Sequence, residues 1–303
     1  MRAVVLYEYG DVDKLHLERD QQEPPFGPRE VRVRVRATSI NPVDWKIRSG
    51  EARKRMPVEF PAILGRDVAG EVVDCGRSVT GFPKGMRVMA MANGTYAEFT
   101  TVRADVLAPI PERLSFVQAA ALPLVLTTGA QLMERAVKVQ PGWRVLVTGA
   151  AGSVGRTAVH VGRKHGAHVT AGVRARQREE AETLGADRVV AIDDEAEVAV
   201  LRDFDAIADT VGGETIGKLL HALQAGGVLG SVLGVPEAAQ GKDIRVESLM
   251  VQPDASRLYQ LADDVARGEF SIPIARTFRL EDAPQAQNFA EKRHPGGKVL
   301  LVA

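Results

Sequence analysis

Residues 145–155 read VLVTGAAGSVG, in which an apolar, β-prone run leads into three glycines spaced three residues apart. A dinucleotide site needs a strand, a tight glycine turn, and a helix whose N-terminus faces the pyrophosphate. Gly152 would let the backbone approach the phosphates, and Gly155 would let the helix pack closely on the strand. The residues that we predict to bind the cofactor here are Gly149, Gly152, Ser153, Val154 and Gly155.

The glycine spacing alone would also suit an ordinary strand-to-helix turn without a ligand, so the surrounding sequence matters. Four more apolar runs follow, AHVTAGV, DRVVAI, FDAIADTVG and GGVLGSVLG, and amphipathic stretches such as SVGRTAVHVGRKHG, ARQREEAETLG and ETIGKLLHALQAG separate them. Apolar strands that alternate with helices predict a doubly wound parallel sheet covered on both faces. This context favours a Rossmann-type α/β nucleotide-binding domain.

The sequence before this domain is rich in β signals. Residues 31–38, VRVRVRAT, alternate strictly, so their valines are expected to face a core. Asn93-Gly94 separates two further alternating runs and predicts a hairpin turn. Ser115 is a candidate N-cap for a helical run that Pro123 interrupts. The tail ends in the strand candidates IPIARTF and GKVLLVA, which we expect to rejoin the first domain.

These patterns predict two domains, of which the β-rich one is discontinuous. We expect a β-rich domain over residues 1–120 that is completed by 265–303. The nucleotide-binding domain is expected over residues 121–264.

Composition excludes several classes of protein. The 303 residues carry 39 Lys and Arg against 39 Asp and Glu, which argues against nucleic acid as the main partner. No apolar run approaches the roughly 20 residues that span a bilayer. Cys75 is the single cysteine, so neither a disulfide framework nor a thiolate zinc cluster can form within the chain. We expect a cytoplasmic protein without a membrane partner.

The residues behind the second strand candidate indicate which dinucleotide is bound. An acidic residue at that place would hold the ribose 2′-hydroxyl of NAD. This chain has Arg174, Arg176 and Arg178 there, with no carboxylate before Glu179. Guanidinium groups suit the 2′-phosphate of NADPH. We predict NADPH as the cofactor and Arg174 and Arg176 as its ligands; the alternative is that these arginines only solvate the start of a helix.

The order of the motifs resembles the medium-chain dehydrogenase/reductase superfamily. TSINPVDWKIRSG, FPAILGRDVAGEVVDCG, VQAAALPLVLTTGAQLM, the mid-chain VTGAAGSVG, LGAD and the closing GKVLLV carry the resemblance, which covers essentially the whole chain. Within the superfamily the chain is most similar to the zinc-free NADPH:quinone oxidoreductases, whose first domain is a GroES-like catalytic domain. Extended short-chain dehydrogenases share the glycine pattern, but they use a Tyr-x-x-x-Lys pair, and none of the four tyrosines here is followed by such a lysine.

The resemblance also bears on metal binding. In zinc alcohol dehydrogenases of the superfamily, a cysteine ligand falls at Asn41 and a His-Glu pair falls at Arg66-Asp67. Catalytic zinc prefers thiolate and imidazole donors, which Asn41 and Arg66 do not supply. We therefore predict no metal. Without this Lewis acid, the substrate must accept hydride with little electrophilic help, as quinones and α,β-unsaturated carbonyls do.

The resemblance further implies which residues meet the substrate and the nicotinamide. It implies that Asn41 lies near the nicotinamide ribose and that Asp44 and Lys46 are polar groups of the catalytic pocket. Asp44 could instead cap the following helix, and Lys46 could pair with a surface acid. Thr127 and Gly234 match contacts at the nicotinamide end of the cofactor. Relatives often dimerise through an edge of the nucleotide-binding sheet, and GGVLGSVLG could form such an edge, so we expect a possible homodimer.

Two other functions stay open. An enoyl-thioester reductase would use the same hydride addition. A non-catalytic NADPH-binding protein, either a regulator or a structural paralogue, would share the glycine turn without turnover.

Overall fold

The computed structural model describes residues 1–293 and 295–303, which form two compact units. Unit 1 contains residues 1–124 and 253–303, and unit 2 contains residues 125–252. The first division, after residue 124, lies close to the predicted boundary at residue 120, and the second, after residue 252, lies before the predicted boundary at residue 264. The second of these predicted boundaries falls inside helix α8 (Ala255–Ala266), which belongs to unit 1.

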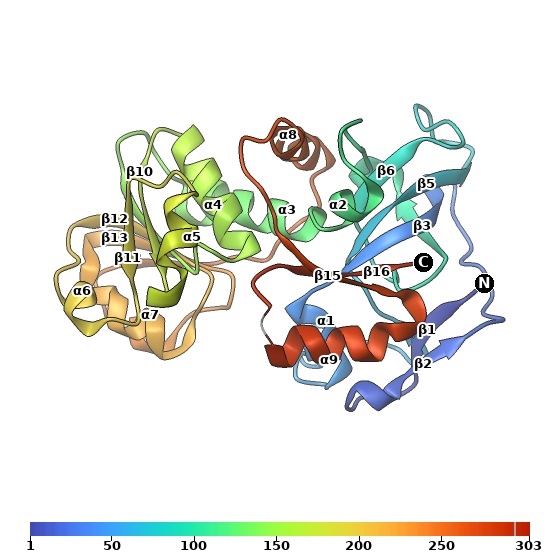
Figure 1. Cartoon of the computed structure of the whole chain (residues 1–303), viewed down its shortest axis with the longest axis horizontal. Helices are drawn as coiled ribbons and strands as arrows, with labels where there is room; N and C mark the ends of the chain where they lie inside the picture. Colours follow the sequence, from blue (N-terminus) through green and yellow to red (C-terminus); the bar gives the residue numbers. More distant parts are fainter. Residues whose placement is uncertain (294) are drawn as a thin grey trace. The chain divides into compact units, whose positions relative to one another are not determined.

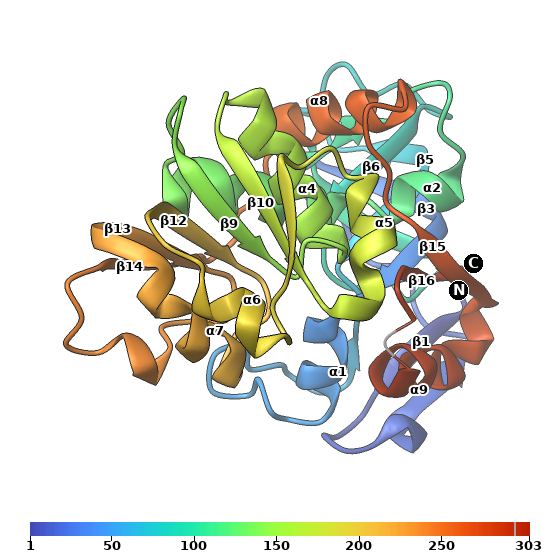
Figure 2. The same cartoon turned by 60° about the vertical axis from the view of Figure 1, so that its left-hand side comes forward.

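Unit 2 is built on a six-stranded sheet whose strands are all parallel, in the order β11-β10-β9-β12-β13-β14 (Figure 2). The strands are β9 (Arg144–Thr148), β10 (His168–Val173), β11 (Arg188–Ala191), β12 (Phe204–Asp209), β13 (Leu223–Ser231) and β14 (Arg245–Ser248). Between them lie α4 (Ser153–Lys164), α5 (Arg178–Glu182), α6 (Glu195–Ala199) and α7 (Gly213–Leu219). The parallel α/β sheet predicted from the sequence is confirmed.

Two details of this sheet differ from the expectation. The stretch GGVLGSVLG does not form an edge, because β13 lies between β12 and β14. The edge strand β14 has the sequence RVES, with one apolar residue, so neither its hydrophobic periodicity nor its composition predicts a strand. Helix α6 was also missed, since its five residues are too short to show a helical period.

Unit 1 contains a seven-stranded sheet with the order β15-β16-β3-β5-β6-β8, and β7 pairs with β3 on the edge opposite β5. Figure 1 shows β15, β16, β3, β5 and β6 of this sheet. Its strands are β3 (Glu30–Ile40), β5 (Asp67–Cys75), β6 (Arg87–Met91), β7 (Phe99–Arg103), β8 (Ala108–Pro109), β15 (Ile274–Arg279) and β16 (Lys298–Val302). A smaller sheet joins β1 (Ala3–Leu6), β2 (Leu15–Glu18) and β4 (Ala62–Ile63). The predicted return of the C-terminal strands is confirmed, because β16 pairs with β3.

The hairpin predicted at Asn93-Gly94 is wrong. Strand β6 pairs with β5 and β8, whereas β7 pairs with β3, so the two strands that flank this turn are not partners. Gly94 does have a positive φ of 67°. After the turn, however, Tyr96 enters the core, and its backbone pairs with Val4 and Leu64. Tertiary pairing has thus overridden a correct local turn signal.

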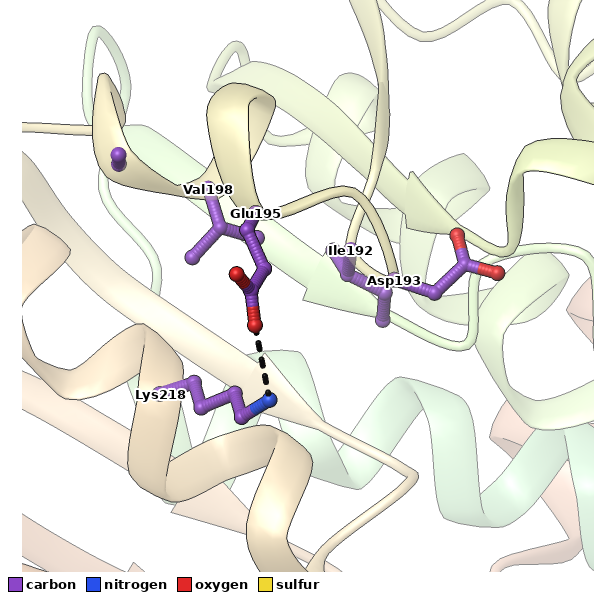
Figure 3. A pocket seen from close by; sticks show the side chains of 6 residues that line it. Ile192, Asp193, Glu195, Val198 and Lys218 are labelled. Carbon is purple, nitrogen blue, oxygen red and sulfur yellow. Dashed lines mark ion pairs between the residues drawn. The ribbon is translucent and has the colours of Figure 1, made fainter.

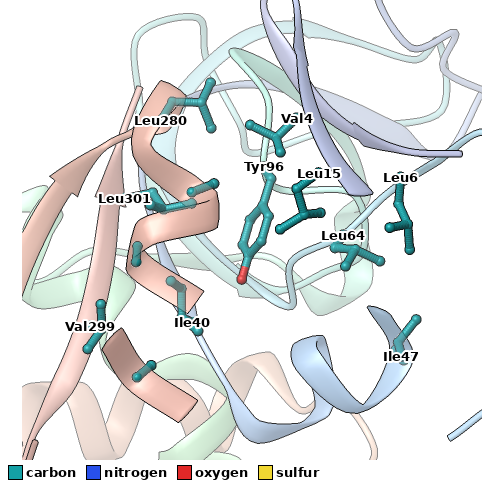
Figure 4. Packing of buried hydrophobic residues seen from close by; sticks show 13 residues of the cluster. Val4, Leu6, Leu15, Ile40, Ile47, Leu64, Tyr96, Leu280, Val299 and Leu301 are labelled. Carbon is teal, nitrogen blue, oxygen red and sulfur yellow. The ribbon is translucent and has the colours of Figure 1, made fainter. Parts of the chain in front are cut away.

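Helices of unit 1 pack on this framework. They are α1 (Pro42–Arg48), α2 (Phe116–Ala120), α8 and α9 (Ala283–Arg293). Ser115 caps α2 in a capping box with Gln118, and Pro123 opens the next helix, α3 (Pro123–Gln131), as the sequence predicted. Figure 4 shows Tyr96 among the apolar side chains that α9, β16, α1 and the small sheet bury together. None of the described helices is both long and apolar enough to cross a membrane.

The turn after β9 has the close approach that its glycines allow. Gly149 has a φ of 63°, which favours glycine. A Cβ atom at Gly155 would lie 2.7 Å from the Cα of Ala150 and nearer still to the carbonyl oxygen of Gly149. Helix α4 can therefore begin against β9 only if residue 155 has no side chain.

We predict that Gly155→Ala lowers the free energy of unfolding by about 1–3 kcal/mol, because the new methyl group meets backbone atoms. Gly217→Ala is the matched control, since Gly217 also lies in a helix and its added Cβ would be 3.4 Å from Ala238. The control is expected to stabilise unit 2 by about 0.5–1 kcal/mol. Urea unfolding of both variants measures this, and equal effects would contradict the packing argument.

Candidate active site

The glycine turn of unit 2 presents free backbone donors. Helix α4 begins at Ser153, with Gly152 as its N-cap residue. The first N–H groups of a helix have no intrahelical acceptor, and the helix dipole favours an anion beside them. These groups belong to Ser153, Val154 and Gly155, so this end of α4 fits the pyrophosphate of a dinucleotide.

A buried aspartate that the sequence analysis missed holds the strand ends around this turn. Asp209 ends β12 and is 1% exposed. Its Oδ1 accepts hydrogen bonds from Thr148 Oγ1 (2.8 Å) and Gly212 N (3.0 Å), and its Oδ2 accepts from Ser231 Oγ (3.0 Å). The carboxylate thereby connects the carboxyl ends of β9, β12 and β13. The only sequence signal was an acidic residue at the end of an apolar run.

The three arginines behind β10 are in different situations. Arg178 donates to the carbonyl of Val189 and pairs with Glu197. Arg174 and Arg176 are exposed, and their guanidinium groups have no hydrogen bond or ion pair within residues 1–293 and 295–303. The backbone between them is fixed, because Ala175 N donates to Asp193 Oδ1 (2.8 Å). Two unpaired guanidinium groups thus extend from an ordered turn.

Figure 3 shows a neighbouring pocket of about 370 Å³ beyond the end of β11. Its charged lining includes Lys218 and Glu195, which pair with each other at 3.8 Å, and Asp193, which holds the arginine turn. Because its charges already have partners inside the chain, we assign it no ligand of its own.

The two residues predicted at the nicotinamide end lie elsewhere in unit 2. Thr127 lies on α3 and is 1% exposed. Its Oγ1 is buried without a hydrogen-bond partner among the described residues. Gly234 follows β13 with a φ of 103°, which disfavours other residue types. An orphaned buried hydroxyl is costly, so Thr127 fits a position that a ligand completes.

In unit 1, Asn41 lies in a buried polar cluster at the ends of three strands. Its Nδ2 donates to Asp67 Oδ2 (2.8 Å) and to Ser39 Oγ (3.2 Å). Its Oδ1 accepts from the ammonium of Lys298 at 2.5 Å. Asp67 and Lys298, which sequence reasoning did not select as functional, are 0% and 6% exposed. We call Ser39, Asn41, Asp67 and Lys298 the buried polar cluster.

Asp44 adjoins this cluster, whereas Lys46 does not. Asp44 is buried in the first turn of α1, and its Oδ2 accepts from the backbone N of Asn41 (2.8 Å) and from the hydroxyl of Tyr96 (3.1 Å). Burial raises the pKa of Asp44 to about 6, and the hydrogen bond from Asn41 opposes this shift. Lys46 is partly exposed on the same helix, and its ammonium pairs with Glu51 at 3.1 Å. The structure thus brings Asn41 and Asp44 together and places the Lys46 ammonium beside a surface carboxylate.

Comparison with known proteins identifies the family. Residues 27–112 match the alcohol dehydrogenase GroES-like domain, and residues 184–301 match a family described as zinc-binding dehydrogenase. The chain is 31% identical to the mouse NAD(P)H oxidoreductase RTN4IP1, mitochondrial, over 99% of its own length and 89% of the relative. A quinone oxidoreductase from Coxiella burnetii superposes with a TM-score of 0.89 at 28% identity, covering 100% of this chain and 99% of the other. Mycobacterial Rv1454c, solved in complex with NADPH, gives 0.86 at 26% identity with full coverage of both chains.

The chain therefore belongs to the medium-chain dehydrogenase/reductase superfamily and is quinone oxidoreductase-like. This confirms the resemblance seen in the sequence, and the family is one of NAD(P)H oxidoreductases. The mouse relative is named as mitochondrial, so the cytoplasmic location stays a prediction, as does a homodimer.

Because one matching family is described as zinc-binding, the donor groups at the positions named above decide whether zinc fits. Asn41 offers an amide, and Arg66 directs its guanidinium to Asn93 Oδ1 (2.7 Å) and Met56 Sδ (3.6 Å). Asp67 is the one carboxylate, and it already faces the Lys298 ammonium at 3.7 Å. This set lacks thiolate and imidazole and contains two cationic groups, so it does not fit zinc.

Asp44 yields a prediction about stability and pH. Its folded pKa of about 6 lies above the ordinary value of 3.8, so the folded state binds more protons between these values. The stability that protonation of Asp44 contributes is then fully present below about pH 4, and it is lost as the pH rises through 6. Between pH 5 and pH 8 we expect the free energy of unfolding of wild type to fall by about 1 kcal/mol relative to that of Asp44→Asn.

Urea unfolding at several pH values between 5 and 8 measures this difference. Asp13→Asn is the control, since Asp13 is exposed. A difference between wild type and Asp44→Asn that stays constant over this range would show that Asp44 does not titrate there.

Proposed function

We propose that the protein is a zinc-independent oxidoreductase that transfers hydride from NADPH to a quinone or an α,β-unsaturated carbonyl compound. The observation that carries this proposal is the set of groups at the expected metal positions, where Asn41 offers an amide and Arg66 a guanidinium in place of thiolate and imidazole. Without a Lewis acid at these positions, acceptors that delocalise the incoming electron pair themselves are the best substrates. Relatives named as quinone oxidoreductases support the same class.

Unit 2 supplies the groups that would bind the cofactor. The N–H groups of Ser153, Val154 and Gly155 would hold the pyrophosphate, and Asp209 keeps the surrounding strand ends in place. The buried hydroxyl of Thr127 would gain the partner that it lacks, and Gly234 would leave its backbone accessible. Bound NADPH would supply the hydride, and the chain would supply position and hydrogen bonds.

The preference for NADPH over NADH rests on Arg174 and Arg176. Their guanidinium groups have no partner among the described residues, and the ordered turn limits the entropy lost when they bind a phosphate. A 2′-phosphate carries close to two negative charges and accepts charge-assisted hydrogen bonds. The complex of Rv1454c with NADPH supports this choice.

Unit 1 supplies the groups that we assign to the substrate side. Asn41 would shape the pocket at the nicotinamide ribose, with Asp44 and the buried Tyr96 behind it. The assignment of Lys46 to the pocket stays a prediction, and its ammonium would have to leave Glu51 to stabilise a developing oxyanion.

Replacing Arg174 and Arg176 tests the cofactor preference. In Arg174→Ala/Arg176→Ala we expect the Kd for NADPH to rise about tenfold or more, while the Kd for NADH changes little, because only NADPH carries the lost phosphate contact. Arg178→Ala is the matched control, since its guanidinium is already bound to Val189 and Glu197. Fluorescence titration gives the constants. An unchanged ratio of the two Kd values in the double variant would overturn the assignment.

A turnover assay tests the reaction itself. NADPH oxidation is followed with a quinone, an alkenal and an enoyl-thioester as separate acceptors, each with and without EDTA. We expect turnover with the quinone or the alkenal and no effect of the chelator. Turnover confined to the enoyl-thioester would identify an enoyl-thioester reductase, NADPH binding without turnover would indicate a non-catalytic protein, and loss of activity in EDTA would restore a metal to the mechanism.

A further inference from the structure

The first residue of β16, Lys298, is a charged side chain that is buried among apolar core residues. The strand reads KVLLV, and its first four residues are all buried, with Lys298 only 6% exposed. Removing an ammonium group from water is costly unless nearby groups compensate its charge. The surroundings of the Lys298 ammonium should therefore show what it does.

Three oxygen atoms surround this ammonium. Asn41 Oδ1 lies at 2.5 Å, the backbone carbonyl of Ile40 at 3.5 Å, and Asp67 Oδ2 at 3.7 Å. Burial lowers the pKa of Lys298, and the negative charges of Asp67 and Asp44 raise it again. Oxygen atoms from a side-chain amide, a carbonyl and a carboxylate also make up the ligand sets of hard cations. The Lys298 ammonium thus lies where a hard metal ion would lie among oxygen ligands of this kind.

The side chain of Asn41 is held at both of its ends by opposite charges. Its oxygen faces the ammonium of Lys298, and its NH₂ group faces the carboxylate of Asp67. A rotation of the amide by 180° would turn the oxygen toward the carboxylate and the NH₂ group toward the ammonium. Both contacts would then be repulsive, so the two charges select one orientation of the amide.

Asp67 cannot follow a displaced amide, because its own position is fixed. Its Oδ1 accepts from the backbone N of Leu124 at 2.7 Å, in the first turn of α3. Its Oδ2 accepts from the hydroxyl of Ser39 as well as from Asn41. The one group of the cluster that enters from a distant part of the sequence, and the one that carries positive charge, is Lys298.

We propose that Lys298 is a positioning residue, whose ammonium acts as a built-in cation in place of a metal ion and fixes the orientation of the Asn41 side chain. The consequence for turnover rests on the proposed function, whereas the built-in cation can be tested without it. A purely structural role would be served as well by apolar side chains, since replacing a buried ion pair by apolar residues often leaves stability unchanged.

The first experiment removes the Lys298 ammonium by mutation and adds a soluble ammonium ion in its place. In Lys298→Ala the missing atoms correspond to n-propylammonium. We expect the variant to melt several degrees below wild type and n-propylammonium to raise its Tm, whereas tetramethylammonium, which has the charge but no N–H donor, does not. Wild type and the exposed-lysine control Lys84→Ala should not respond to either ion. Equal effects of the two ions, or none, would overturn the built-in cation.

The second experiment removes both charges and serves also if Lys298→Ala does not fold. Lys298→Met/Asp67→Asn removes both charges of the pair together, so we expect it to fold and to bind NADPH within about twofold of wild type. Its amide at Asn41 is no longer oriented by charge, so kcat should fall about tenfold or more. In Lys298→Ala, n-propylammonium should restore part of kcat together with Tm. A double variant that keeps the kcat of wild type would overturn the positioning role.

The two proposals fail in different ways. If wild type reduces no acceptor, the proposed function fails, and the melting experiment with n-propylammonium still decides whether Lys298 is a built-in cation. If wild type turns over and the double variant does so equally well, the reaction class stands and the role of Lys298 falls.

Discussion

The antiparallel pairing of β16 with β3 is the contact on which the candidate site of unit 1 depends. Val299 lies opposite Ile40 in this pairing, which places Lys298 next to Asn41 across 257 residues of sequence. The end of the chain is therefore a structural part of the first domain. Until this last strand has docked, the carboxylate of Asp67 and the amide of Asn41 lack their cationic partner, so the site is completed only when the fold is.

The buried charges of unit 1 differ in how well they are compensated. Asp67 has hydrogen-bond donors on both oxygen atoms and an ammonium nearby. Asp44 has donors on one oxygen only, and its Oδ1 has no partner among the described residues. Burial therefore raises the pKa of Asp44 to about 6, because desolvation of its charge outweighs the hydrogen bonds that it accepts. The polar groups around Asn41 thus combine a fixed charge pair with a carboxyl group whose protonation changes near neutral pH.

Much of the fold could be predicted from the sequence because its signals are local. Alternating valines identify β3, the glycine turn identifies the start of α4, and Ser115 and Pro123 mark the starts of α2 and α3. The errors arose where the pairing of strands distant in sequence determines the structure. Asn93-Gly94 makes a turn, but the strands beside it pair elsewhere, and β14 is a strand only because β13 offers it an edge.

The same distinction explains what was missed in the site. The glycine turn and the arginines of unit 2 lie close together in sequence and follow a spacing that chemistry requires, so they could be selected in advance. Asp67, Lys298 and Asp209 could not, because each looks like an ordinary charged residue at the end of a strand. Their burial becomes visible only when strands distant in sequence are placed side by side.

The two units thus place charged and polar groups in two different ways. In unit 2, helix α4 presents N–H groups at its start, and Arg174 and Arg176 have guanidinium groups without a partner among the described residues, so the proposed anionic cofactor could complete them. In unit 1 the charges of Lys298 and Asp67 are already paired inside the protein, on the two sides of the Asn41 amide that they orient. A charge left free selects a ligand, whereas a charge that is satisfied internally sets geometry. The metal-free hydride transfer that we propose would need both, because affinity would come from the cofactor contacts and precision from a site that does not rearrange.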